Sequence, residues 1–293
     1  MSVYKRSYRP YSGPLTGGRT RFFVLVRYAL SDVWGSRITN VLFVLCLIPT
    51  LFSMVTIYIM NNETVRLLIS GPQAGPPIAI DERFFFAMML GQYWPALALT
   101  AWVGPKLMAT DMTNSALPII LSHPVSRLEY VLAKFTVLFG LLSCVTWVPA
   151  LLLFAFQAHL SPVPWAMQYS RIASGMFAGG LVWITLLSLM ALALASWVKW
   201  RIVATGMVVA TMFVPAGMGE VFNAVMRTNL GSVINIPRMM INLWRNLIGF
   251  TPSSYLSRNE LPVSVILVSL LLIALLCAAA LNARVRAREV VRG

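Results

Sequence analysis

Residues 172–198 read IASGMFAGGLVWITLLSLMALALASWV, a run of 27 residues without a charged side chain. A helix of about 20 apolar residues crosses the roughly 30 Å hydrocarbon core of a bilayer, so this run predicts a transmembrane helix. The whole chain has the same character: 58% of its 293 residues are hydrophobic, 11% are charged, and its mean hydropathy is +0.77. Soluble domains carry about 25% charged residues. The sequence therefore predicts an integral membrane protein.

Six stretches of the chain are long and apolar enough to cross a membrane, and they predict an all-α membrane protein. They form a single domain, residues 21–283, between a flexible basic tail at 1–20 and a second basic tail at 284–293. Residues 1–20 have no apolar core of the kind found in a cleavable signal peptide. The expected spans are 38–60, 84–108, 130–156, 172–198, 202–222 and 262–282.

The distribution of basic residues predicts the orientation of these spans. With the N-terminus in the cytoplasm, the segments 1–37, 106–134, 199–201 and 283–293 hold 16 Lys and Arg, and the other side holds 7. Short cytoplasmic loops carry an excess of such residues, so both termini are expected in the cytoplasm. The net charge of +14 is accordingly interpreted as affinity for membrane lipid with anionic headgroups, rather than for nucleic acid.

Two segments outside the spans show helical amphipathic patterns. Residues 19–37, RTRFFVLVRYALSDVWGSR, place apolar side chains such as Leu25 and Val33 on one face and Arg21 and Asp32 on the other. This pattern predicts a helix lying in the cytoplasmic membrane interface, and the alternative is an extension of the first span. Residues 223–260 mix apolar and basic residues, which predicts short amphipathic helices on the outer surface before the last span.

Prolines and one carboxylate mark further positions in the spans. Pro49, Pro95, Pro149 and Pro215 fall inside predicted spans, where each removes a backbone hydrogen bond and favours a kink. Glu220 lies at the outer end of the fifth span and is interpreted as a boundary residue. The middle of the spans lacks ionisable residues, which argues against a proton-coupled transporter or ion pump.

The connection between the second and third spans, residues 111–134, reads DMTNSALPIILSHPVSRLEYVLAK. If the second span ends near Met108, Asp111 or Thr113 can cap a short helix that stops before Pro124. A hairpin needs only a few residues, so the added helix suggests a docking element for a partner, although an ordinary hairpin loop with exposed basic residues is an alternative. The candidate docking residues are Asp111, Leu117, Ile120, Leu121, Ser122, His123, Pro124 and Arg127.

This connection resembles the coupling loop of type-2 ABC exporter permeases, especially the multi-copper enzyme maturation branch. The resemblance rests on Asp111, on ALPIILSHPVSR at 116–127 and on the helix restart over 130–134, whereas Ser115 and Ala133 stand where glycine is common. It implies a transmembrane permease subunit in a bacterial inner membrane, with a cytoplasmic coupling helix between spans two and three. The implied partners are a nucleotide-binding ATPase subunit, which docks on the loop, and a second permease copy or paralogue.

No catalytic or cofactor-binding residues are expected in this chain. The phosphate-binding pattern G-x-x-x-x-G-K-[ST] is absent, so the chain is not predicted to be an enzyme, and ATP and Mg²⁺ are expected on the partner subunit. His123 and His159 lie on opposite sides of the predicted membrane, and Cys46, Cys144 and Cys277 are far apart in apolar runs, so no metal site is expected. A non-transporting membrane scaffold is the alternative function.

Small and flexible residues in the spans have packing interpretations. Gly175 and Gly179 lie four residues apart in GMFAG, a spacing that allows two helices to approach closely, and they are candidate helix-packing residues. The 16 methionines are interpreted as adaptable packing residues. Apolar and aromatic residues in the spans are compatible with a hydrophobic substrate.

Overall fold

The computed structural model describes residues 18–70, 78–113, 126–161, 164–250 and 261–287. In these residues the chain is all helical and contains no strand. Six helical segments are long and apolar enough to span a membrane, which confirms the predicted all-α architecture and supports the prediction of a membrane protein. They are α2 (Arg37–Asn61), α4 (Glu82–Thr113), α6 (Arg127–Val145) continued by α7 (Trp147–Leu160), α9 (Ser170–Trp197), α10 (Arg201–Met226) and α12 (Val263–Ala287).

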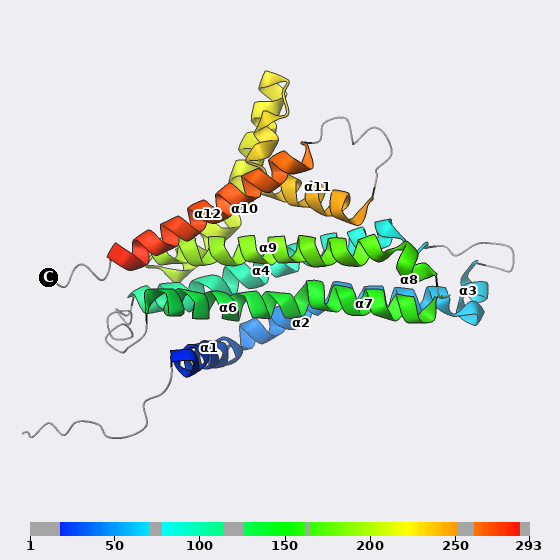
Figure 1. The fold of residues 1–293 in the computed structure, drawn as a ribbon, viewed down its shortest axis with the longest axis horizontal. Coiled ribbons are helices and arrows are strands. Elements are labelled where there is room, and N and C mark those ends of the chain that lie inside the picture. Colours follow the sequence, from blue (N-terminus) through cyan, green and yellow to red (C-terminus); the bar gives the residue numbers. More distant parts are fainter. Residues whose placement is uncertain (1–17, 71–77, 114–125, 162–163, 251–260, 288–293) are drawn as a thin grey trace, which may run out of the picture.

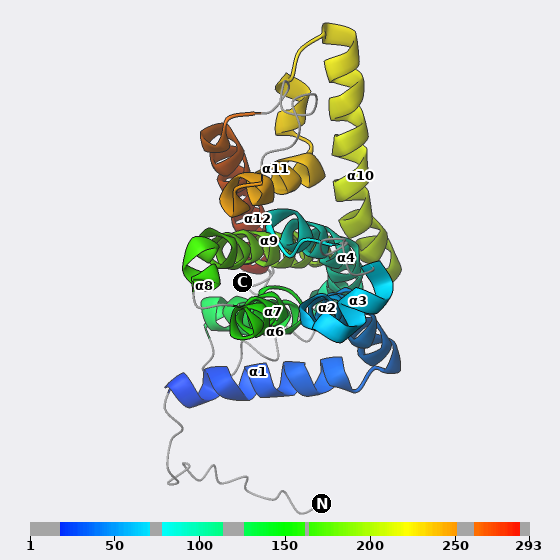
Figure 2. The same ribbon diagram turned by 90° about the vertical axis from the view of Figure 1, so that its right-hand side faces the viewer.

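Helices α2, α4, α6, α7 and α9 form the main bundle and run side by side along the long axis of the molecule (Figures 1 and 2). Helices α4 and α9 are its most buried members, and α9 contacts α4, α6, α7, α11 and α12. Five shorter helices complete the described chain. They are α1 (Gly18–Trp34), α3 (Glu63–Ser70), α8 (Trp165–Gln168), the 3-10 helix η1 (Leu230–Val233) and α11 (Ile236–Ile248).

Helix α1 lies across one end of the bundle, nearly at right angles to it (Figure 2). It packs on α6, α4 and the start of α2. Ala29 and Val33 are buried against these helices, whereas Phe23 and Tyr28 are exposed. The amphipathic helix predicted before the first span is therefore present, and its buried face includes two of the residues expected there.

The same end of the bundle gathers the segments that carry most of the basic residues. In Figure 1 the start of α6 and the C-terminal ends of α4, α9 and α12 lie on the left with α1, and α3 and α8 lie on the right. The indole nitrogen of Trp197 donates to the carbonyl of Ala280 at 3.2 Å, and Nε of Arg284 donates to the carbonyl of Ser196 at 3.3 Å. These contacts hold the C-terminal ends of α9 and α12 together.

The predicted third span is two helices rather than one. Thr146 separates α6 from α7 with φ −115° and ψ −98°, and its hydroxyl donates to the carbonyl of Leu142 at 2.7 Å. Pro149 follows three residues later and has no N–H to donate to the carbonyl of Val145. The other three prolines expected to favour kinks, Pro49, Pro95 and Pro215, lie inside uninterrupted helices.

Helix α10 differs in direction from the main bundle. Its first half packs against α4 and α9, and its second half rises away from them almost perpendicular to the bundle (Figures 1 and 2). Large apolar side chains are exposed along this second half, among them Phe213, Met218, Val221 and Val225. The length and composition of α10 suit a span, but its sequence did not indicate this divergent direction.

Candidate functional site

The central part of the candidate docking loop lies outside the described residues. Leu117, Ile120, Leu121, Ser122, His123 and Pro124 all fall in residues 114–125, whereas Asp111 and Arg127 on either side are described. The prediction that the second span ends near Met108 is wrong, because α4 continues to Thr113. Hydrogen bonds within the helix extend this last turn, including the 2.8 Å bond from the Thr113 hydroxyl to the carbonyl of Ala109. Asp111 therefore lies within α4 and does not cap a following helix.

The side chain of Asp111 instead joins the two helices that flank the loop. Its Oδ2 accepts a hydrogen bond from the hydroxyl of Tyr130 at 2.8 Å and pairs with Nζ of Lys134 at 2.8 Å. The side chains of Lys134 and Asp111 are only 16% and 20% exposed, and Tyr130 is 1% exposed. Because the pair is largely withdrawn from solvent, loss of either partner would leave a poorly solvated charge. This triad fixes the end of α4 against the first two turns of α6.

The start of α6 has its own local cap. Ser126 and Glu129 form a capping box, in which the Ser126 hydroxyl accepts from the Glu129 N–H at 3.2 Å and the Glu129 carboxylate accepts from the Ser126 N–H at 2.7 Å. This arrangement satisfies two backbone donors that a helix N-terminus otherwise leaves unpaired. Helix α6 consequently begins at a defined residue immediately after the loop.

Two further contacts connect this region to α1 and α10. Nζ of Lys106 on α4 pairs with the Asp32 carboxylate of α1 at 3.2 Å and also donates to the Asp32 carbonyl. The hydroxyl of Thr113 lies 2.5 Å from the carbonyl of Lys199, two residues before α10 begins. We call the set Asp32, Lys106, Asp111, Thr113, Tyr130 and Lys134 the inner frame.

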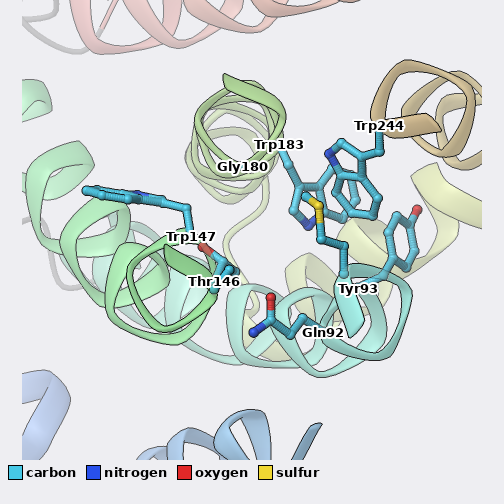
Figure 3. A pocket seen from close by; sticks show the side chains of 9 residues that line it. Gln92, Tyr93, Thr146, Trp147, Gly180, Trp183 and Trp244 are labelled. Carbon is cyan, nitrogen blue, oxygen red and sulfur yellow. The ribbon is translucent and has the colours of Figure 1, made fainter. Parts of the chain in front are cut away.

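A buried aromatic cluster lies deeper in the bundle, where four helices meet (Figure 3). Tyr93 of α4 stacks on Trp183 of α9 with ring centroids 4.4 Å apart, and Trp244 of α11 meets both rings edge-on at 6.0 Å. The Tyr93 hydroxyl lies 3.6 Å from the sulfur of Met212 on α10. The cluster therefore couples the positions of α4, α9, α10 and α11 through side-chain packing.

A small cavity of about 10 Å³ adjoins this cluster. Figure 3 shows the cluster on one side of the cavity, and Thr146 at the α6–α7 junction on the other. Gln92 also lines it, and the amide nitrogen of Gln92 donates to the Thr50 hydroxyl of α2 at 2.8 Å. The cavity has the volume of about one water molecule and is too small for a larger substrate in this conformation.

Gly175 and Gly179 of α9 lie directly against α11. A Cβ atom at Gly175 would lie 2.8 Å from the backbone nitrogen of Ile248, and one at Gly179 would lie 2.5 Å from Cδ1 of Trp244. The Trp244 indole also donates to the carbonyl of Gly179 at 3.0 Å. These contacts require a residue without a side chain at both positions, and they bring α11 into the bundle along the N-terminal half of α9.

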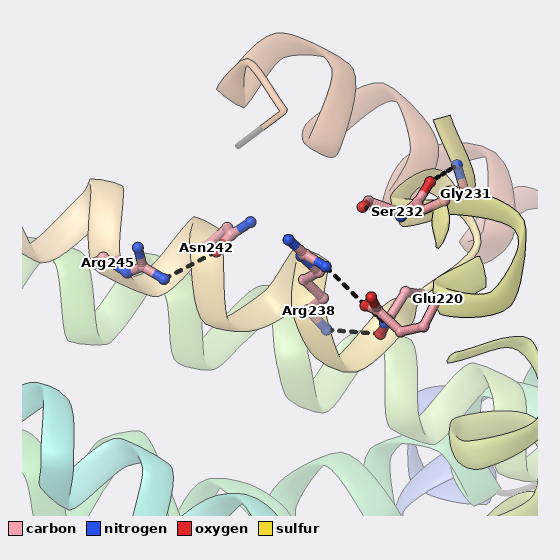
Figure 4. Close-up of polar contacts among 8 residues, drawn as sticks. Glu220, Gly231, Ser232, Arg238, Asn242 and Arg245 are labelled. Atoms are coloured by element: carbon pink, nitrogen blue, oxygen red, sulfur yellow. Dashed lines mark hydrogen bonds and ion pairs between the residues drawn. The ribbon is translucent and has the colours of Figure 1, made fainter. Parts of the chain in front are cut away.

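Polar contacts tie α11 to α10 (Figure 4). Glu220 of α10 pairs with Nη1 of Arg238 at 2.7 Å and accepts from the Asn235 amide at 3.0 Å. Asn223 accepts from the Gly231 N–H at 2.7 Å and donates to the Ser232 hydroxyl at 3.0 Å. Glu220, interpreted from the sequence as a boundary residue, is thus part of a network that joins α10, η1 and α11.

The described residues contain no group of three or more His, Cys, Asp or Glu placed to hold a metal ion. The cysteines also differ in their surroundings: Cys46 is buried, Cys277 is partly buried and Cys144 is exposed. Cys144 therefore lies on the bundle surface rather than in its packed interior.

Comparison with known proteins does not assign a family. No family model matches the chain, and no curated protein matches it either.

Proposed function

We propose that this chain is the transmembrane permease subunit of an ATP-driven ABC exporter. The observation that carries the proposal is the inner frame. Residues 114–125 connect α4 to α6, and side-chain contacts at the ends of these helices extend to α1 and to the start of α10. A displacement of this connection by a partner would therefore move four helices together: α1, α4, α6 and α10.

In this proposal three of the shorter helices, α1, η1 and α11, have defined places, as does the loop between α4 and α6. Helix α1 lies in the cytoplasmic membrane interface, residues 114–125 form the coupling helix, and η1 and α11 belong to the outer side. Both termini are cytoplasmic, in a bacterial inner membrane. The position of α1, the start of α6 and the end of α12 at one end of the bundle supports this orientation (Figure 1), as does the excess of basic residues in those segments.

The proposed mechanism uses nucleotide chemistry on a separate subunit. ATP and Mg²⁺ bind that ATPase subunit, and its movement displaces the coupling loop of this chain. The inner frame transmits the displacement to α4, α6 and α10, and the network of Glu220 and Arg238 transmits it from α10 to α11. Two permease copies, or this chain and a paralogue, move against each other in response.

A hydrophobic substrate fits the surfaces available for this movement. An apolar groove of about 700 Å³ lies between α9, α10 and α12, and its lining includes Met190, Leu194, Met207 and Leu276. Apolar linings of this kind favour apolar ligands, because such ligands give up no hydrogen bonds to water on binding. The proposed cargo is accordingly lipid-like or otherwise hydrophobic.

The decisive experiment measures co-purification of a nucleotide-binding ATPase subunit with this chain, at equal membrane expression of each variant. Leu121→Ala should reduce recovery more than Arg127→Ala, because truncation of a buried interface anchor costs about 2 kcal/mol or more and an exposed ion pair contributes under about 1 kcal/mol. Leu68→Ala is the matched control, since Leu68 is 82% exposed on α3 at the opposite end. It should leave recovery unchanged.

A second measurement separates an exporter from a membrane scaffold. The purified chain alone should show no ATP hydrolysis, and the complex should show hydrolysis that Leu121→Ala uncouples or reduces. If Leu121→Ala recovers as much ATPase subunit as the wild type and its complex hydrolyses ATP at the wild-type rate, the loop does not couple the two subunits. Stable binding of a partner without any ATPase activity would favour the scaffold.

A further inference from the structure

A pocket of about 850 Å³ opens beside the junction between α9 and α10, at the same end of the bundle as the inner frame. Its walls come from the C-terminal third of α4, from the two residues before α10 and from the first five residues of α10. Trp102, Ile202 and Val203 supply apolar surface, and Lys199 and Arg201 supply the charge. No acidic residue lines this pocket among the residues that the structure describes.

Arg201 has unused hydrogen-bonding capacity in this pocket. Its guanidinium carbon lies 4.3 Å from the centre of the Trp102 ring, and its Nη2 atom is buried without a hydrogen-bond partner. Stacking on an indole orients a guanidinium through its face and leaves the N–H groups at its edge for a planar or tetrahedral anion. A buried donor without a partner is costly, so a ligand that accepts from Nη2 would relieve that cost.

The surroundings of Arg201 favour a negative charge. Lys199 is exposed and forms no ion pair with any residue in the described part of the chain. Helix α10 begins at Arg201 with no side-chain cap and no acidic residue in its first turn, so its N-terminal N–H groups add to the positive potential. The nearest acidic side chain along α4, Asp111, is already held by Lys134 and Tyr130.

We propose that this pocket binds the phosphate headgroup of an anionic phospholipid. Arg201 and Lys199 contact the phosphate, and Thr205 lies on the same wall as a further hydroxyl. The acyl chains lie along Ile202 and Val203, which are 86% and 44% exposed. Trp200, 74% exposed, sits at the headgroup level, where tryptophan is enriched in membrane proteins. The apolar walls select a lipid over free phosphate, and the inference stands independently of the proposed transport function.

The test is native mass spectrometry of the purified chain with phosphatidylglycerol or phosphatidylcholine at equal concentration. The wild type should retain phosphatidylglycerol preferentially. Each basic residue near a membrane surface contributes about fivefold to anionic lipid affinity, so the double change Lys199→Gln and Arg201→Gln should lower the preference by about twenty-five-fold. Lys199→Gln alone should lower it by about fivefold, and Lys199 is exposed, so its replacement leaves folding intact.

Arg284→Gln is the matched control. Arg284 also lies over an indole at this end of the bundle, 5.1 Å from the Trp197 ring, but it donates to the Ser196 carbonyl and does not line the pocket. Its replacement should leave the lipid preference unchanged. Equal retention of phosphatidylglycerol by the wild type and both Lys199 variants would overturn the proposal. Inorganic phosphate that displaces the lipid at millimolar concentration would instead assign the pocket to a free anion and also overturn it.

Discussion

The contact between α9 and α11 gives a prediction that depends on a single methyl group. In Gly175→Ala the new Cβ would lie 2.8 Å from the backbone nitrogen of Ile248 and 2.9 Å from the carbonyl oxygen of Leu247. Backbone atoms cannot rotate away as a flexible side chain does, so α11 must shift. Overpacking of this kind costs about 1–3 kcal/mol.

Gly140→Ala provides the matched comparison, because it is the same substitution in a transmembrane helix. A Cβ atom at Gly140 meets nothing within 4 Å, and alanine is favoured over glycine in a helix interior by about 1 kcal/mol. Gly175→Ala should therefore lower the free energy of unfolding and Gly140→Ala should raise it. The two variants should differ from each other by about 2–4 kcal/mol.

The assay is thermal unfolding in one detergent, followed by intrinsic tryptophan fluorescence. With about 2–4 °C of Tm per kcal/mol, Gly175→Ala should unfold about 5 °C below the wild type, and Gly140→Ala should unfold at or slightly above it. Unfolding of membrane proteins is often irreversible, so all variants must be heated at the same rate. Equal melting temperatures for the two variants would show that α11 does not pack on Gly175 as described.

Four further predictions concern orientation and the polar contacts. In a chain whose own cysteines are replaced, single cysteines at Gln73 and Asn229 should react with an impermeant thiol reagent on intact cells, and one at Ser122 should not; labelling at Ser122 would reverse the orientation. Asp111→Asn should destabilise the protein by about 1–3 kcal/mol in a denaturant or thermal titration, because Lys134 loses its partner in a largely buried place. Asp32→Asn should lower the free energy of unfolding by under about 1 kcal/mol, since Asp32 is 63% exposed. An equal effect of Asp111→Asn and Asp32→Asn would contradict the role of the buried Asp111–Lys134 pair in the inner frame. Glu220→Gln should also lower the free energy of unfolding by under about 1 kcal/mol, because Glu220 is 52% exposed. The same change should increase protease cleavage in α11, because it weakens the contact between residue 220 and Arg238.

The long apolar runs predicted the spans well, because a helix in a bilayer must satisfy all its backbone hydrogen bonds within itself. The ends and breaks of these helices were less predictable. Helix α4 extends past Met108 because Thr110 and Thr113 bond to carbonyls within the helix and Asp111 finds its partners on α6. Such pairing depends on which helices are neighbours, and a linear pattern does not contain that information.

The candidate site was likewise only partly predictable. The sequence singled out Asp111 and the stretch up to Lys134, but it interpreted Asp111 as a helix cap rather than as the partner of Tyr130 and Lys134. Each of four prolines was expected to favour a kink, and the described spans are interrupted near one of them, at Thr146, three residues before Pro149. Proline removes one backbone hydrogen bond wherever it lies in a helix, and the packing around it determines whether the helix is interrupted there.

The glycines of α9 also bear on how the chain assembles during synthesis. Helix α11 follows α9 and α10 in the chain and is synthesised after them, and its polar residues Arg238 and Asn242 disfavour its insertion into lipid alone. Its contact surface includes Gly179 of α9 and the stacked rings of Tyr93 and Trp183, so this surface is complete only when α4 and α9 are in contact. A chain that stops before residue 236 lacks α11 and would leave the surface of α9 at Gly175 and Gly179 uncovered.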